Sequence, residues 1–355
     1  MENIVIYRND QTYCAFPDIV KSLNGDGLVC FREAPRRDRL GHFDPESKAV
    51  LVRSRDGGAT WGEKIIICQD ADGIQDCSIM RLRGGVLMAN FFKWRFARKK
   101  ESLGDLAPKC DLGSCGFHEI HWAAIAGTYV TRSLDGGKTW TAPVEAGSGK
   151  LKALATSAPA LECQSGTLLL PVYVNDEQYK NLEVHNGVWV ARSKDAGKTW
   201  PEMIPVAADA EGKVWLEEPA LVQLPSGKIL CMMRASVGGG DYLRQAESFD
   251  EGETWSPFRK TPMVGHPPHL LRLHDGRLLC TYGYRHEPFG IRARLSRDDG
   301  KTWDMEHEIV IRRDGRNADL GYPSSVELEP GKILTVYYFN DETETRFIAG
   351  SIFTV

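Results

Sequence analysis

The octapeptide Ser54-Arg-Asp-Gly-Gly-Ala-Thr-Trp61 decides the fold, because versions of it return four more times along the chain. The copies span residues 133–140, 193–200, 248–255 and 296–303, and all five follow the pattern S-x-D-x-G-x-T-W. Five such octapeptides in one chain indicate an internal repeat. The pattern is typical of a β-turn in which the Asp accepts hydrogen bonds from turn amides, the Gly adopts a positive φ and the Trp packs on the flanking strands. We expect these boxes to be structural, because a carboxylate bound within a peripheral turn faces no substrate.

A second repeat alternates with the first and consists of two apolar strands joined by a tight turn that contains glycine. These hairpins span residues 16–31, 77–91, 159–173, 219–234, 268–284 and 323–339. Five of them are followed by a third strand that ends at a box and then by a fourth strand. Four antiparallel strands repeated six times predict an all-β protein, a six-bladed β-propeller in a single domain over residues 1–355. The last blade lacks a box, so we expect the N-terminal strand at Ile4–Arg8 to complete this blade and close the ring.

One long insertion interrupts the second blade at residues 94–127. A loop of this length in a compact domain is usually a lid or a specificity element, so we expect it to lie over the central funnel. Its cysteines and histidines, Cys110, Cys115, His118 and His121, follow no standard zinc pattern. We therefore expect neither a metal site nor another cofactor.

The composition is that of an ordinary soluble domain, with 355 residues, 42% hydrophobic and 26% charged, and a net charge of -4. No basic surplus points to nucleic acid, and no apolar run approaches the roughly 20 residues that span a bilayer. The N-terminal residues alternate like a strand and lack a signal-peptide pattern, and several of the nine cysteines stand singly in apolar strands. We expect reduced thiols and a cytoplasmic protein, or a secreted protein if a signal has been removed.

The candidate site lies where the innermost strands of the blades begin, because these strands converge on the propeller axis. Their first residues include carboxylates, a tyrosine and two histidines, and the ends of the second strands add basic residues. The residues concerned are Asp76, Glu217, Glu218, His266, His269 and Tyr322, with Arg32, Lys93, Arg234 and Arg285 from the second strands. Charged groups at a hub are costly unless they are paired or used, so this concentration predicts an active site.

With its boxes along the whole chain, the sequence resembles the bacterial members of the sialidase (neuraminidase) superfamily. Tyr322, in Gly-Tyr-Pro-Ser-Ser, matches the nucleophilic tyrosine of that family. Glu218, in Glu-Pro-Ala-Leu-Val, matches the glutamate that polarises this tyrosine. Arg234, which ends Cys-Met-Met-Arg, matches the second arginine of the triad that binds the substrate carboxylate. Glu33, in Phe-Arg-Glu-Ala, stands where the family has a supporting glutamate.

The other two arginines of the family's triad have no counterpart in register. The first belongs to a Phe/Tyr-Arg-Ile-Pro motif, which here reads Cys14-Ala-Phe-Pro17, and the third position falls in Glu287-Pro-Phe-Gly290. Arg32 could supply the missing guanidinium from the end of its strand, and Arg285 lies near the third position. The resemblance thus implies a clamp of Arg234, Arg32 and Arg285, and leaves open whether the sugar is sialic acid.

The resemblance implies an exo-acting glycoside hydrolase that releases a terminal acidic sugar, sialic acid or a related one, from an oligosaccharide or glycoconjugate. Its mechanism would be retaining, with the tyrosine as nucleophile and Glu218 as the base that takes the phenol proton. The family's acid/base aspartate lies on the loop after the first hairpin, where Asp44 is the nearest match and Asp38 the second, and Asp76 is a further candidate. His266 or His269 would contact substrate hydroxyls or act as an acid/base.

Two other functions stay open. A propeller with His266 or His269 beside Tyr322 could perform β-elimination on, or hydrolysis next to, a uronic acid, and the missing first-strand arginine favours this. A non-catalytic carbohydrate-binding propeller is the third possibility, although sugar binding alone is usually served by aromatic and amide side chains. A product with a new ultraviolet absorbance would identify a lyase, free sialic acid a sialidase, and binding without either product a lectin.

Overall fold

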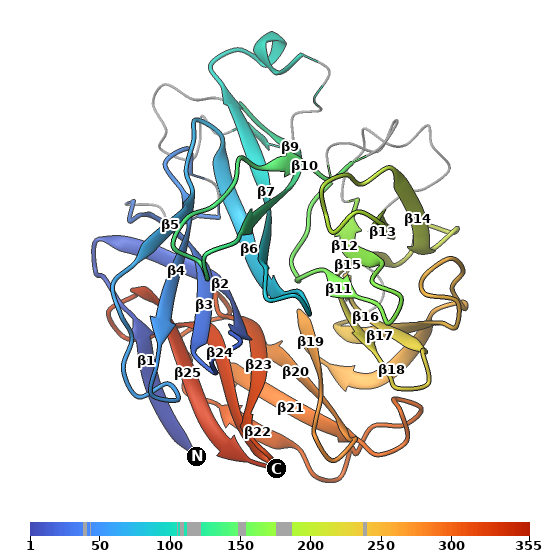
Figure 1. The fold of residues 1–355 in the computed structure, drawn as a ribbon. Helices are drawn as coiled ribbons and strands as arrows, with labels where there is room; N and C mark the ends of the chain where they lie inside the picture. Colours follow the sequence, from blue (N-terminus) through green and yellow to red (C-terminus); the bar gives the residue numbers. More distant parts are fainter. Residues whose placement is uncertain are drawn as a thin grey trace.

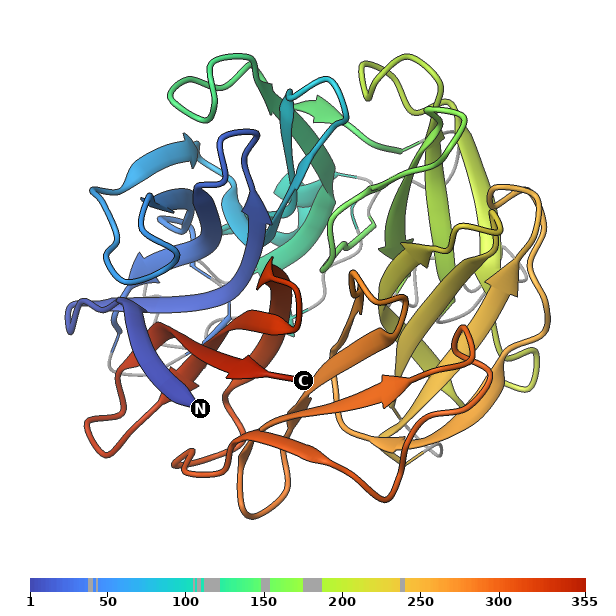
Figure 2. The ribbon, with the colours of Figure 1, turned by 60° about the horizontal axis from the view of Figure 1, so that its bottom comes forward.

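The computed structural model is a six-bladed β-propeller, as the repeats predict (Figure 1). The structure describes residues 1–37, 41–42, 44–104, 106, 110–111, 122–147, 154–174, 187–236 and 240–355. Within these ranges the strands form six antiparallel sheets, one for each blade. The sheets are arranged in a ring around a common axis (Figure 2).

Blades 1 to 5 take their strands in chain order, and the first strand of blade 1 contacts those of blades 2 and 6 beside the axis. Blade 1 consists of β2 (Thr12–Lys21), β3 (Gly27–Pro35), β4 (Lys48–Ser54) and β5 (Ile65–Cys68). Blade 2 consists of β6 (Gly73–Arg81), β7 (Leu87–Ala97), β9 (Trp122–Ser133) and β10 (Val144–Glu145), with β8 (Cys110–Asp111) beside β9. Blade 3 consists of β11 (Leu161–Glu162), β12 (Leu168–Tyr173), β13 (Val188–Ser193) and β14 (Glu202–Ala207).

The second half of the ring repeats this order. Blade 4 consists of β15 (Trp215–Gln223), β16 (Ile229–Ser236), β17 (Tyr242–Ser248) and β18 (Arg259–Val264). Blade 5 consists of β19 (Pro268–Arg272), β20 (Leu278–Tyr284), β21 (Gly290–Ser296) and β22 (Ile309–Arg312). Blade 6 consists of β23 (Gly321–Glu329), β24 (Lys332–Asn340), β25 (Arg346–Thr354) and the N-terminal β1 (Glu2–Tyr7).

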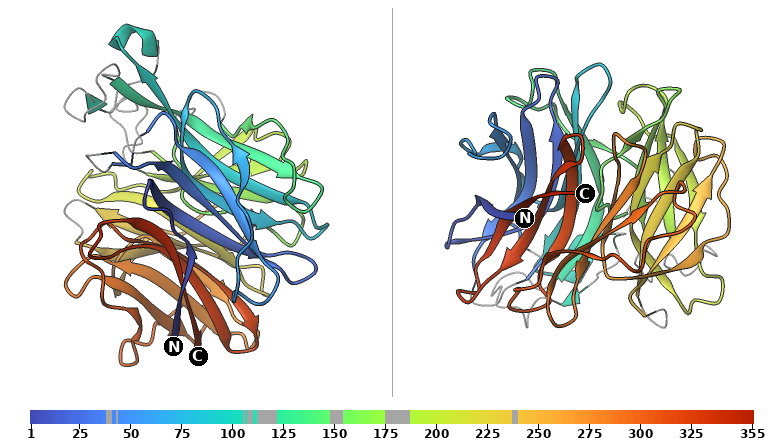
Figure 3. Two further views of the ribbon diagram at one scale, coloured as in Figure 1. Left: turned by 90° about the vertical axis from the view of Figure 1, so that its left-hand side faces the viewer. Right: turned by 90° about the horizontal axis from the view of Figure 1, so that it is seen from below.

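The N-terminal strand closes the ring. β1 runs antiparallel to β25, with Glu2 opposite Ile352 and Val5 opposite Ala349. The two chain ends therefore lie close together on one side of the molecule (Figures 1 and 3). The predicted closure is confirmed. The strand begins at Glu2, two residues before the predicted start at Ile4.

A buried carboxylate at the hub joins the first blade to both of its neighbours. Asp18 on β2 accepts hydrogen bonds from Ser324 Oγ of blade 6 (2.5 Å) and from the amide of Ile79 of blade 2 (2.7 Å). It also accepts one from the amide of Ile19 (3.0 Å). Burial raises the pKa of Asp18 to about 6. The carboxylate thus ties the first and last blades together near the axis, while β1 ties them at the rim.

The boxes form the expected turns. In the first copy, Asp56 accepts hydrogen bonds from Thr60 N (2.9 Å), Thr60 Oγ1 (2.5 Å) and Ser54 Oγ (2.8 Å). Gly58 has a φ of 99°, and Trp61 Nε1 donates to its carbonyl (3.2 Å). The same Thr-to-Asp bonds recur at Asp135, Asp195, Asp250 and Asp298. All of these hydrogen bonds join residues of the same octapeptide, so each box contains every partner that its turn needs.

The apolar core is divided among the interfaces between neighbouring blades. Between blades 1 and 2, for example, Leu28 and Leu51 pack with Ile79 and Phe91. Similar clusters fill the other interfaces. Among the described residues, seven cysteines are free and buried in these layers. The described part of the chain contains no helix with the length and hydropathy to cross a membrane.

The ends of the blade-2 insertion are strands, where we expected a loop. β7 and β9 stay paired as far as Ala97 opposite Trp122, and a 3-10 helix, η1 (Lys100–Leu103), follows β7. The ladder continues because residues 92–96 alternate between apolar and polar side chains, the pattern of a strand. This extension projects from one face of the propeller (Figures 1 and 3). Four residues of interest lie outside the described ranges: Asp38, Cys115, His118 and His121.

Candidate active site

The hub is shaped by four inner strands that each carry a β-bulge at the same place. The hydrogen-bond register of β2, β6, β15 and β23 breaks near the start of the strand. At each break a residue other than glycine adopts a left-handed backbone: Phe16 (φ 56°), Asp76 (50°), Glu218 (47°) and Tyr322 (51°). Such a conformation costs on the order of 1–3 kcal/mol and persists where the surroundings enforce it, often at functional sites. Four bulges around one axis therefore indicate a site at the hub.

Two of the bulges bring Tyr322 of blade 6 against Glu218 of blade 4. The Tyr322 hydroxyl donates a hydrogen bond to Oε1 of Glu218. Arg234, on the second strand of blade 4, places Nη1 3.1 Å from both carboxylate oxygens of Glu218. The tyrosine is 9% exposed and the glutamate 5% exposed, so this contact is almost closed to water. The structure thus brings together three residues that the sequence placed in three separate strands.

The surroundings shift the pKa values of Tyr322 and Glu218 in opposite directions. Burial raises the pKa of Tyr322 well above its ordinary value, and the nearby carboxyl groups of Asp76 and Glu218 add to the effect. Burial acts in the same direction on Glu218, but the charges of Arg234 and Arg285 and the hydrogen bond from Tyr322 outweigh it and lower its pKa. The result is a neutral phenol that donates to an ionised carboxylate.

Arg32 and Arg285 bring two more guanidinium groups to the hub. Arg32 is completely buried on β3, directly opposite Ala15 of β2. Its Nε donates to a backbone carbonyl (3.2 Å), whereas Nη1 and Nη2 have no hydrogen-bond partner among the described residues. Arg285 likewise has one backbone bond (3.1 Å), an unpartnered Nη2, and its Cζ 5.8 Å from the ring centroid of Tyr322. Buried cationic nitrogens without acceptors are costly, so they indicate a place for an anion.

Asp76 and two residues of blade 3 form another side of the hub. Ser157 Oγ donates a hydrogen bond to Asp76 Oδ2 (2.6 Å) and lies 3.3 Å from the hydroxyl of Tyr173. Asp76 Oδ1 is buried without a partner in the described part of the chain. Burial, together with the negative charge of Glu218, raises the pKa of Asp76 to about 8. The carboxyl is therefore protonated at neutral pH. The sequence analysis did not single out Tyr173, although it ends the second strand of its blade just as Arg32 and Arg234 lie near the ends of theirs.

The two predicted histidines both reach the hub as neutral imidazoles. His269 lines a cavity of about 20 Å³ together with three of the four bulge residues, Phe16, Asp76 and Tyr322. Burial lowers the pKa of His269 to about 4. His266 is buried, and its pKa falls to about 3 because of burial and the positive charges of two nearby arginines.

Two predicted carboxylates belong to other networks. Glu33 accepts hydrogen bonds from Tyr7 of β1 (2.8 Å) and from Lys64 (2.7 Å), so its carboxylate lies between blade 1 and β1 of blade 6. Asp44 is 3% exposed, and its carboxylate accepts bonds from Arg37 Nε (2.9 Å) and from a backbone amide of its own turn (2.8 Å). Neither carboxylate makes a contact with the tyrosine, the glutamate or the arginines of the hub through its hydrogen bonds.

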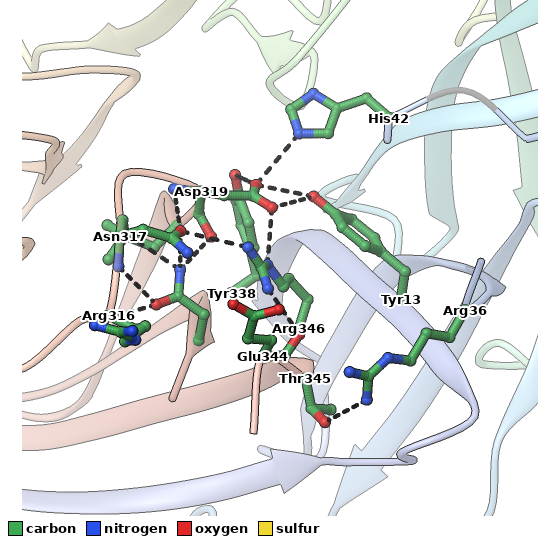
Figure 4. Close-up of polar contacts among 12 residues, drawn as sticks. Tyr13, Arg36, His42, Arg316, Asn317, Asp319, Tyr338, Glu344, Thr345 and Arg346 are labelled. Atoms are coloured by element: carbon green, nitrogen blue, oxygen red, sulfur yellow. Dashed lines mark hydrogen bonds and ion pairs between the residues drawn. The ribbon is translucent and has the colours of Figure 1, made fainter. Parts of the chain in front are cut away.

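Sequence reasoning missed a carboxylate, Asp319, which holds together a hydrogen-bond network between blades 6 and 1 (Figure 4). It accepts hydrogen bonds from the hydroxyls of Tyr13 (2.9 and 3.0 Å) and Tyr338 (3.1 Å) and from Arg346 Nε (2.8 Å). His42 Nε2 lies 3.3 Å from the same carboxylate. Burial would raise the pKa of Asp319, but the contacts with His42, Arg346 and Tyr13 hold it well below its usual range. Asp319 is therefore ionised.

Comparison with known proteins supports the propeller fold and identifies related proteins. The profile of the BNR repeat-like domain family matches residues 114–335. A curated sialidase from Micromonospora viridifaciens is 24% identical over 315 residues, which cover 81% of this chain and 45% of that protein. The chain thus spans less than half the length of this relative.

Two solved structures extend the comparison. A protein of unknown function from Dyadobacter fermentans is 33% identical, covers 100% of this chain and 98% of its own, and superimposes with a TM-score of 0.89. The Hadza microbial sialidase Hz136 shares the fold at 16% identity, with a TM-score of 0.70 over 97% of this chain and 66% of that one. The chain belongs to the BNR repeat-like domain family and is a member of the sialidase superfamily.

Proposed function

We propose that the protein is an exo-acting glycoside hydrolase that releases a terminal acidic sugar with retention of configuration. The observation that carries this proposal is the buried contact in which the Tyr322 hydroxyl donates a hydrogen bond to Glu218. A weak nucleophile such as a phenol needs an adjacent base to accept its proton, and a carboxylate within hydrogen-bond reach supplies one. Arg234, bound to the same carboxylate, keeps this base ionised.

The chemistry consists of two displacements at one carbon. Oη of Tyr322 forms a bond to the anomeric carbon while the bond to the leaving group breaks, and the phenol proton passes to Glu218. A neutral phenol approaches a carbon that bears a carboxylate without the repulsion that a carboxylate nucleophile would meet. Water then attacks the same carbon, the bond to Tyr322 breaks and Glu218 returns the proton to the tyrosine. A further acid and base must give a proton to the leaving oxygen in the first step and take one from the water in the second. Two inversions restore the original configuration.

The acidic group of the substrate would be bound by the guanidinium groups of Arg32, Arg234 and Arg285. Among the residues that the structure describes, two nitrogens of Arg32 and one of Arg285 have no hydrogen-bond partner, and these arginines lie on the blades at either side of the tyrosine blade. The planar fork of arginine matches a carboxylate in two-point contacts. Arg285 lies over the ring of Tyr322, so a carboxylate bound there would be next to the reacting carbon. This arrangement favours glycosides of 2-keto acids, of which sialic acid is one.

The remaining predicted residues take supporting roles in this proposal. Asp76 is protonated at neutral pH, and its Oδ1 has no partner within the described ranges, so it can donate a hydrogen bond to an oxygen of the bound sugar. His266, a neutral imidazole, can contact a sugar hydroxyl. Asp44 is paired with Arg37 and would shape the loop on which it lies.

The test is hydrolysis of aryl glycosides of acidic sugars by the purified protein, beginning with a fluorogenic α-sialoside. Tyr322→Phe and Glu218→Gln should each lower kcat/KM by about 10³-fold or more, because one removes the nucleophile and the other its base. Tyr337→Phe is the matched control, since this tyrosine is buried in the same blade and bonds to Ser351, away from the hub. Full activity in Tyr322→Phe, or no turnover of any acidic glycoside by the native protein, contradicts the proposal.

A β-elimination on a uronic acid is the second candidate, and His266 favours it. An imidazole that stays neutral next to the tyrosine–glutamate pair is suited to accept a proton from carbon. The same assay separates the two reactions, because elimination creates a conjugated double bond with a new ultraviolet absorbance and hydrolysis does not. Binding of acidic sugars without either product would identify a carbohydrate-binding protein.

A further inference from the structure

The proposed hydrolysis needs a group that gives a proton to the departing oxygen. Of the three predicted aspartates, Asp38 lies outside the described residues, and Asp44 and Asp76 are poorly placed for this. The carboxylate of Asp44 is 3% exposed and is already held by Arg37 and a backbone amide. Asp76 is 2% exposed and lines the small hub cavity together with Tyr322. The leaving group of an exo-acting enzyme points toward solvent, so its proton donor should lie on the solvent side of the nucleophile.

His42 is a titratable group in that position. Its ring packs edge-on against Phe16 with the centroids 5.1 Å apart, and Phe16 in turn packs on Tyr322 at 4.6 Å. One aromatic ring therefore separates the imidazole from the nucleophile. His42 is 38% exposed, whereas Tyr322 is 9% exposed, so the histidine stands closer to solvent on the same wall of the hub.

Asp319 fixes the orientation of this imidazole (Figure 4). The carboxylate is ionised and can only accept, so Nε2 of His42, at 3.3 Å, carries the hydrogen between them. Nδ1 then faces away from Asp319 and has no partner among the described residues. A carboxylate that holds one imidazole nitrogen while the other exchanges a proton is a recurrent arrangement in general acid–base catalysis.

Asp319 is itself held by several groups and is linked to the nucleophile. Tyr13, Tyr338 and Arg346 all donate to its carboxylate, so its position does not depend on the histidine. It precedes Tyr322 by three residues, at the entrance to β23. The orienting carboxylate and the nucleophile therefore lie on one short segment of the chain.

We propose that His42, oriented by Asp319, is the acid and base that exchanges the leaving-group proton, an inference that rests on the glycosidase function proposed above. In the first displacement, the Nδ1 proton of the imidazolium passes to the glycosidic oxygen while that oxygen departs with the bonding electron pair. In the second, Nδ1 takes a proton from the attacking water, whose oxygen bonds to the anomeric carbon. Asp319 is a positioning residue and keeps its negative charge throughout.

The experiment compares His42→Gln with the native protein on aryl glycosides of the acidic sugar that the native protein hydrolyses. The series runs from dinitrophenyl glycosides, whose leaving group needs no proton, to unsubstituted phenyl glycosides, whose leaving group does. His42→Gln should lose about 10²–10⁴-fold in kcat/KM on phenyl glycosides and little on dinitrophenyl glycosides. His286→Gln is the matched control, because His286 is another exposed rim histidine paired with an aspartate, Asp241, at 2.8 Å.

Asp319→Asn should show the same steeper dependence on the leaving group, which a purely structural role would not produce. An unchanged dependence in His42→Gln, or a selective loss on phenyl glycosides in Asp44→Asn instead, overturns the assignment and leaves the tyrosine mechanism intact. Absence of turnover by the native protein on every glycoside overturns the proposed function, and this inference with it.

Discussion

Replacing Asp76 by asparagine should make the protein less sensitive to alkaline pH. The wild-type carboxyl is buried at the hub, and burial together with the charge of Glu218 raises its pKa from an ordinary value of 3.8 to about 8. A folded-state pKa above the unfolded value means that the bound proton stabilises the fold. This stabilisation is complete below about pH 4 and is lost as the pH rises through about 8.

The magnitude follows from the size of the shift. Each pKa unit corresponds to about 1.4 kcal/mol, and between about pH 5 and pH 9 the unfolded carboxyl is ionised while the folded one loses its proton. The wild-type protein should therefore lose about 4 kcal/mol of unfolding free energy over this range through Asp76 alone. Asp76→Asn keeps the shape of the side chain but cannot ionise, so this part of the loss disappears.

The assay is urea denaturation of both proteins at the two pH values, followed by the fluorescence of the nine tryptophans. The difference in unfolding free energy between variant and wild type should shift by about 4 kcal/mol in favour of the variant from about pH 5 to pH 9. Asp56→Asn is the control, because hydrogen bonds from Thr60 and Ser54 lower the pKa of Asp56 to about 2 and it stays ionised throughout. A difference that is the same at both pH values refutes the reasoning, because it would mean that Asp76 is ionised in the folded protein already at about pH 5.

Two further predictions concern buried charges at the hub. Asp18→Ala should lower the unfolding free energy, measured by urea denaturation, by about 3–5 kcal/mol, because it leaves the buried donors of Ser324, Ile79 and Ile19 without an acceptor. A loss below about 1 kcal/mol would contradict the role of Asp18 in closing the ring. Arg32→Met should keep or raise the thermal midpoint, since it removes a buried cation whose Nη1 and Nη2 have no hydrogen-bond partner in the described part of the chain. The same variant should raise KM for the acidic glycoside about 10-fold or more, and an unchanged KM would show that Arg32 does not bind the acidic group.

The fold was predictable because its signal is local. Each box is complete within eight residues, from Ser54 and Asp56 to Trp61 in the first copy, so its sequence contains every partner that its turn needs. Counting boxes and hairpins then fixes the number of blades. The place of Glu218 and Tyr322 at the hub could be predicted for a related reason, because the inner strands of a propeller begin close to its axis.

The rest of the site depends on contacts that no local pattern encodes. Asp319 lies in a loop without a motif, and its partner Tyr13 is 306 residues away in the chain. The pairing of Asp44 with Arg37 depends on the path of a loop, so the sequence could not show that this carboxylate is already occupied. The position of Glu33 away from the hub arginine could have been predicted, because neighbouring side chains on a strand point to opposite faces and Arg32 is adjacent to Glu33.

The family's first-strand arginine is replaced by Ala15 in this chain, and the position of Arg32 shows how the fold tolerates this change. Ala15 and Arg32 are direct partners on neighbouring antiparallel strands, so their side chains lie on the same face of the sheet. A guanidinium that starts from either strand can therefore reach the same region of the hub, and moving it from β2 to β3 changes its approach more than its destination. Arg285 does the same from the end of β20, near the position that Glu287–Gly290 occupies in the sequence. The hub thus receives its positive charges from β3, β16 and the end of β20, and these guanidinium groups converge although the strands that carry them belong to three different blades.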